Sequence, residues 1–111
     1  MMNYKSCPLT DRVTFLKTLQ GSDLEAICSQ MIGFTEYEAD WKQAQNTILM
    51  CLRDPRPEVS ALAVTCLGHI ARIHGKIDKE IVKQQLASMH IQNDMQGRIE
   101  DVLDDINYFA Q

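Results

Sequence analysis

Residues 54–68, with the sequence DPRPEVSALAVTCLG, constrain the fold more than any other segment of the chain. An Asp-Pro-Arg-Pro turn precedes a helix with small or branched apolar residues on one face: Val59, Ala63, Cys66, Leu67 and Gly68. Small side chains let a neighbouring helix approach closely, and turn-helix units stack in this way in an α-solenoid. The segment therefore predicts stacked helices, and through that architecture a binding function.

Helix start and stop signals divide the chain into six predicted helices, and no segment alternates with the period of two that a strand would require. The first helix is predicted at about 11–20, and the second ends at residue 32. The third is predicted at about 36–53 and the fourth at 57–74. The starting residues that we identify are Thr10, Ser22 with Glu25, Thr35 with Glu38, Pro57, Asp78, and Asn93 or Asp94. The fourth helix is apolar over most of its circumference, so it should be packed on two sides at the centre of the stack.

Part of this pattern resembles the HEAT repeat, in which an Asp-led turn precedes a helix of the Val-Arg…Ala-Ala…Leu-Gly type. The resemblance is specific over residues 54–71, and Ser60 stands where the family usually carries arginine. The arginine ladder between neighbouring repeats is therefore expected to be absent. The resemblance implies an all-α fold, a short α-solenoid of three HEAT-like hairpins at about 9–33, 35–75 and 77–110 in a single domain, 1–111. Proteins of this kind are non-catalytic scaffolds.

Charge and composition exclude several classes of function. The formal charge of −4 disfavours nucleic acid and anionic membranes as partners and favours a basic protein. No apolar run approaches the roughly 20 residues that span a bilayer, and the N-terminal residues lack a signal-peptide core, so we expect a cytoplasmic protein. The four cysteines form no Cys-x-x-Cys pair and are interpreted as reduced thiols. Because no catalytic or metal-binding motif is present, we predict no enzyme activity and no cofactor.

The strongest functional signal is the acidic face of the last helix. Glu100, Asp101, Asp104 and Asp105 share one face, and Asp94 lies on the same side. Like charges four residues apart destabilise a helix by about 0.2–0.5 kcal/mol per pair. Two interpretations stay open: an ordinary solvated face, or a docking surface for a basic partner, which would justify that cost.

Three further residues are weaker candidates for partner binding. Trp41 is either a core residue or an exposed anchor, Tyr108 adjoins the acidic face, and His69 lies on the solvent-facing stripe of the fourth helix. His69 and Cys66 are three residues apart, but no third metal ligand follows at helical spacing. The predicted partner-binding residues are therefore Asp94, Glu100, Asp101, Asp104, Asp105, Tyr108, Trp41 and His69.

In size, acidity and HEAT-like character the chain resembles the small immunity proteins of bacterial toxin–immunity pairs, including those of contact-dependent growth inhibition. The resemblance implies a protein that neutralises a basic toxin domain, a nuclease, by blocking its active site or substrate groove. The carboxylates of the last helix would then replace RNA phosphates. The alternative is a HEAT-like adaptor or scaffold subunit of a larger assembly, and the sequence leaves the oligomeric state open.

Overall fold

The computed structural model describes residues 10–89 and 93–110, without the side chains of 93–95. Within these ranges the chain forms six helices and no strand, which confirms the predicted all-α fold. The helices are α1 (Arg12–Leu19), α2 (Leu24–Tyr37), α3 (Trp41–Cys51), α4 (Pro57–His74), α5 (Lys79–Ala87) and α6 (Asn93–Phe109).

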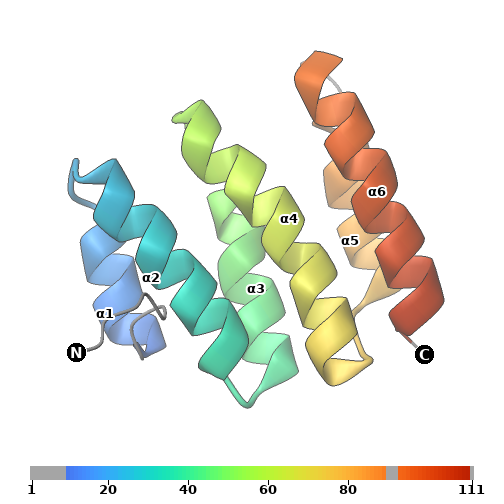
Figure 1. Cartoon of the computed structure of the whole chain (residues 1–111), viewed down its shortest axis with the longest axis horizontal. Coiled ribbons are helices and arrows are strands. Elements are labelled where there is room, and N and C mark those ends of the chain that lie inside the picture. Colours follow the sequence, from blue (N-terminus) through green and yellow to red (C-terminus); the bar gives the residue numbers. More distant parts are fainter. Residues whose placement is uncertain (1–9, 90–92, 111) are drawn as a thin grey trace, which may run out of the picture.

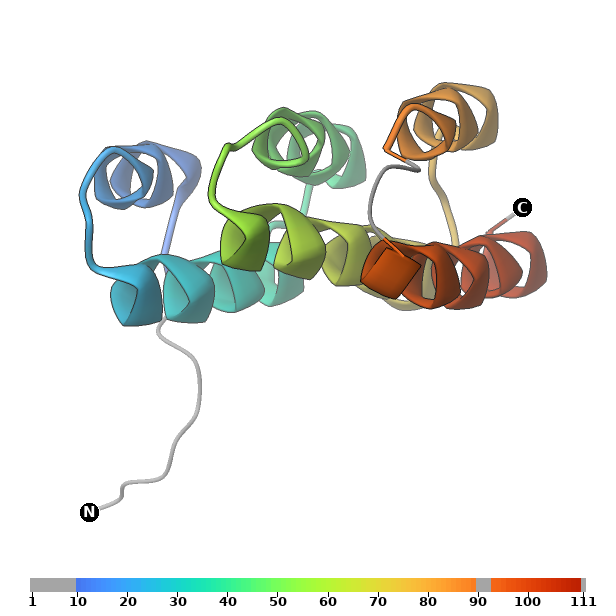
Figure 2. The same cartoon turned by 90° about the horizontal axis from the view of Figure 1, so that it is seen from above.

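Consecutive helices form three hairpins that stack side by side in two layers (Figures 1 and 2). One layer contains α1, α3 and α5, and the other contains α2, α4 and α6 (Figure 2). Helix α4 contacts α2 on one side and α6 on the other, and it also packs on α3 of its own hairpin. The prediction that the fourth helix lies at the centre of the stack is thus correct.

The core runs through the contacts of α4 with its neighbours. The buried residues of α4 are Val59, Ala63, Val64, Cys66, Leu67, Gly68, Ile70 and Ala71. Gly68 faces α6, because an added methyl group would meet Asp105 Oδ2 at 3.4 Å and a Val102 methyl at 3.5 Å. In the first hairpin the rings of Phe15 and Phe34 stack with centroids 5.7 Å apart.

Two of the cysteines behave as small apolar residues of this core. Cys51 and Cys66 are fully buried, and burial raises the pKa of the Cys51 thiol to about 12. A thiol with so high a pKa stays protonated and unreactive at neutral pH. Cys28 is partly exposed, and Cys7 lies outside the described residues.

The predicted boundary between the second and third helices is wrong. Helix α2 passes through Gly33 and ends at Tyr37, because Phe34 and Thr35 are fully buried. Burial of the Phe34 ring offsets the roughly 1 kcal/mol that a glycine costs inside a helix. Helix α3 then begins at Trp41, so Thr35 and Glu38 form no capping box and the first hairpin extends beyond residue 33.

Aspartates cap the first three helices, where the hydroxyl residues Thr10, Ser22 and Thr35 were predicted. Asp11, Asp23 and Asp40 each accept hydrogen bonds from backbone N–H groups of the first turn. An aspartate caps a helix about as well as a serine, so the type of residue does not distinguish Ser22 from the adjacent Asp23. The position at which the helix begins makes Asp23 the cap, and likewise Asp11 rather than Thr10. The predicted features of α4 are correct: Pro57 opens it, and Gly75 ends it with a left-handed φ of 64°.

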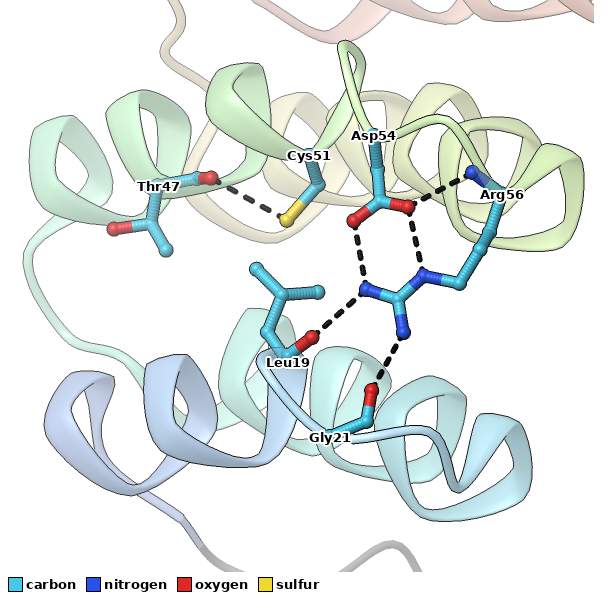
Figure 3. A network of polar contacts seen from close by, with 6 residues as sticks. All are labelled: Leu19, Gly21, Thr47, Cys51, Asp54 and Arg56. Atoms are coloured by element: carbon cyan, nitrogen blue, oxygen red, sulfur yellow. Dashed lines mark hydrogen bonds and ion pairs between the residues drawn. The ribbon is translucent and has the colours of Figure 1, made fainter.

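An arginine that the sequence analysis did not single out ties the second hairpin to the first (Figure 3). Arg56 pairs with Asp54 in the turn before α4, at 2.8 Å. The same guanidinium donates to the carbonyl oxygens of Leu19 and Gly21 at 2.8 Å. Leu19 is the last residue of α1 and Gly21 lies in the turn that follows it. Arg56 therefore links neighbouring hairpins from the turn before α4, although Ser60 stands where HEAT repeats usually carry an arginine within the helix.

A second polar link joins the second and third hairpins. The fully buried amide of Gln45 accepts from the Asp78 backbone N–H at 2.6 Å and donates to the Asp78 carboxylate at 2.9 Å. Lys42 pairs with the same carboxylate at 3.1 Å. Asp78 therefore occupies the predicted N-cap position of α5 but makes no capping hydrogen bond with its side chain, because its carboxylate is engaged by α3.

These links predict how stability depends on pH. Hydrogen bonding from Arg56 lowers the pKa of Asp54, and hydrogen bonding from Gln45 and Lys42 lowers that of Asp78. A carboxylate with a lowered folded-state pKa stabilises the fold above its unfolded value, and that contribution disappears as the pH falls through the folded pKa.

We therefore expect the Asp54→Asn variant to be less stable than wild type at about pH 7, with the difference narrowing below about pH 4. Urea unfolding at several pH values measures this. Asp101 is exposed, and no interaction of its side chain within the chain is described. The control variant Asp101→Asn should therefore show the same decrease in the free energy of unfolding at low pH as wild type. A constant difference between Asp54→Asn and wild type at all pH values would contradict the assignment.

Candidate functional site

The acidic face of α6 is exposed over most of its length. Glu100, Asp101 and Asp104 are exposed, and Asp105 is partly covered. Glu100 accepts a long hydrogen bond of 3.4 Å from Gln96. Three predicted carboxylates thus lie together at the surface.

Asp94 lies in the first turn of α6, and its side chain is outside the described part of the structure.

Asp105 differs from the other carboxylates because it forms an ion pair within the chain. Arg72 Nη2 lies 3.3 Å from Asp105 Oδ2, with both side chains partly exposed. The Arg72 guanidinium also lies over the Phe109 ring, 5.7 Å from its centroid. The expected uninterrupted acidic surface is therefore partly neutralised at this position, where α4 supplies the opposite charge.

A surface groove of about 430 Å³ lies between α4 and α6, and the residues of this ion pair form part of its lining. Its walls contain two arginines and two aspartates, so their formal charges balance. The lining residues are Thr65, His69, Arg72, Arg98, Asp101, Val102 and Asp105. At one end Arg98 donates to Thr65 Oγ1 at 2.8 Å. Arg98 and Thr65 were not predicted as site residues, since only the packing of α6 on α4 brings them together.

A second, more open groove of about 540 Å³ adjoins the first on the same layer. Its lining is mainly apolar and comes from α2 and α4, with Arg98 as a wall common to both grooves. The lining residues are Cys28, Ile32, Pro57, Glu58, Ala61, Leu62 and Arg98. The sequence provided no signal for this groove, because its walls come from helices of all three hairpins.

The three remaining candidates occupy different places. His69 lies in the α4–α6 groove, as part of the predicted solvent-facing stripe. Tyr108 is 79% exposed at the C-terminal end of α6. Trp41 begins α3, is partly buried against the core, and carries Lys42 Nζ 5.2 Å from its ring centroid. The structure therefore favours the core interpretation of Trp41 and places it in the other layer from α6 (Figure 2).

The described residues contain no group of three or more His, Cys, Asp or Glu side chains arranged to hold a metal ion. Among the same residues, no helix combines the length and the apolar character that a membrane span requires. The arrangement of the site is that of a charged surface beside two grooves.

Comparison with solved structures gives an informative likeness. The chain matches no protein-family description and no curated protein sequence, so the resemblance to HEAT repeats stays a prediction. It is similar to a chain in the crystal structure of a CDI complex from Cupriavidus taiwanensis LMG 19424. The TM-score is 0.81, the identity is 29%, and the likeness covers 100% of both chains.

Proposed function

We propose that this protein is an immunity protein of a contact-dependent growth inhibition (CDI) system, which binds a toxin domain and neutralises it. The observation that carries the proposal is the full-length likeness to a chain of a CDI complex, with a TM-score of 0.81 and 29% identity. A CDI complex pairs a toxin with its immunity protein. Because the likeness covers both chains entirely, it concerns the whole fold rather than one hairpin.

Charge supports the inhibitor role over the toxin role for this chain. A nuclease must approach nucleic-acid phosphates, and a protein of formal charge −4 is repelled by them. The same charge attracts a basic nuclease domain and accelerates its encounter with the inhibitor. We therefore propose a basic nuclease toxin as the partner and a stoichiometric, non-catalytic mechanism.

The exposed carboxylates of α6 are the proposed centre of the contact. The ion pairs of the described residues do not include Glu100, Asp101 or Asp104, so these side chains are available to a basic partner. Along α6 they would take the places of substrate phosphates and block the substrate groove of the toxin. The α4–α6 groove adjoins them, and its arginines and aspartates would fix the register of the partner through paired charges.

Coexpression with a toxin tests the proposal. An immunity gene is expected to lie directly downstream of its toxin gene, so the partner to use is the toxin domain of the protein encoded by the gene that precedes this one. We expect this domain to arrest growth when expressed alone and growth to be restored by coexpression. Calorimetry should give one-to-one binding that weakens between about 50 and 500 mM NaCl, as salt screens the opposed charges. A folded protein that neither binds nor neutralises this domain would contradict the proposal and favour the adaptor alternative.

A further inference from the structure

Helix α6 contains a small arginine-binding arrangement that is already occupied within the chain. The Arg72 side chain, which comes from α4, pairs with the Asp105 carboxylate at 3.3 Å and lies over the Phe109 ring at 5.7 Å from the centroid. Asp105 and Phe109 are four residues apart, so the carboxylate and the ring lie one turn from each other on the same side of the helix. A single guanidinium thus contacts a carboxylate and an aromatic ring together.

The same pair of groups occurs one residue earlier, on the exposed side of α6. Asp104 and Tyr108 have the same spacing of four residues as Asp105 and Phe109. Asp104 is exposed and Tyr108 is 79% exposed. Within the described part of the chain, the ion pairs do not include Asp104 and the cation–π contacts do not include Tyr108.

The Tyr108 ring contacts its neighbour. It meets the Phe109 ring edge to face, with centroids 4.8 Å apart and planes at 87°. Phe109 itself packs against the core. The other surface of the Tyr108 ring is exposed to solvent, and a Tyr ring attracts a cation as a Phe ring does.

We propose that Asp104 and Tyr108 bind an arginine side chain of the protein partner. The guanidinium pairs with Asp104 and lies over the Tyr108 ring, as Arg72 does on Asp105 and Phe109. Asp101, one turn earlier on the same face, adds a second negative charge. Arginine fits better than lysine because its planar group hydrogen-bonds a carboxylate and stacks on a ring simultaneously. That a toxin supplies this arginine rests on the proposed function.

A peptide titration tests the arrangement without the toxin. The whole isotope-labelled protein is titrated with acetyl-Gly-Arg-Gly-amide and, in parallel, with the lysine analogue, and NMR shifts are followed. We expect shifts around residues 101–109 and about two- to fivefold tighter binding of the arginine peptide. Tyr108→Phe should retain this preference and Tyr108→Leu should abolish it. Tyr37→Leu removes another exposed tyrosine as a matched control and should change nothing.

Binding to the toxin domain separates this inference from the proposed function. If the wild-type protein binds and neutralises the domain, Tyr108→Leu and Asp104→Asn should each weaken the complex by about two- to fivefold or more, and Tyr108→Phe should not. Unchanged affinity in the first two variants would overturn the arginine site while leaving the immunity role intact. Equal affinity for the two peptides would overturn it as well. Absence of any toxin binding by wild type contradicts the proposed function, and the peptide titration then still decides the arginine site.

Discussion

The Asp101→Lys/Asp104→Lys double variant is expected to bind the toxin domain about 100-fold more weakly than wild type. Most of this loss of affinity should come from a slower association rate. Both residues are exposed, and no ion pair of the described chain includes them, so the substitutions remove no internal contact that the structure shows. Lysines near the C-terminal end of a helix also interact favourably with its dipole. Stopped-flow association and calorimetry measure the effect.

A matched variant separates position from total charge. Glu25→Lys/Glu80→Lys reverses two exposed acids on α2 and α5 and brings the formal charge from −4 to 0, as the α6 double variant also does. We expect this control to reduce the association rate only slightly. Equal losses in the two double variants would mean that overall charge, and not the α6 face, governs binding. Circular dichroism must show that both proteins are folded.

Replacing Gln45 with leucine is expected to destabilise the protein by about 1–3 kcal/mol, because the partly buried Asp78 backbone N–H loses its acceptor. Gln45 is fully buried, and its oxygen accepts the Asp78 N–H at 2.6 Å. Leucine has nearly the same volume, so the change removes hydrogen bonds without leaving a large cavity. Urea unfolding measures the loss, and hydrogen exchange should increase most in α5 and α6.

The adjacent Asn46 provides the control for this experiment. It is exposed and makes one side-chain hydrogen bond of 3.2 Å with Gln45. We expect Asn46→Ala to change the free energy of unfolding by no more than about 0.5 kcal/mol. If Gln45→Leu were as mild as this control, the link between the second and third hairpins would not contribute to stability.

Much of the fold follows from the sequence because helical periodicity and helix stops are local signals. The Asp-Pro turn, Pro57 and Gly75 delimit α4 correctly, since proline and glycine act through the backbone of their own segment. The apolar residues that cover most of the circumference of α4 are a local pattern too, and they indicated its central place in the stack. Gly33 does not end α2 as predicted, because burial of Phe34 carries the helix past it.

For the candidate site, the sequence by itself determined which carboxylates share the face of α6, since residues at helical spacing lie on one side of any helix. Only the tertiary structure decided which of them are available: packing against α4 pairs Asp105 with Arg72 and leaves Asp104 exposed beside Tyr108. It likewise decided that Arg56 and Gln45 connect the hairpins. Their partners lie 33 or more residues away in sequence, and a contact at that separation is set by how the helices pack, which no local pattern encodes.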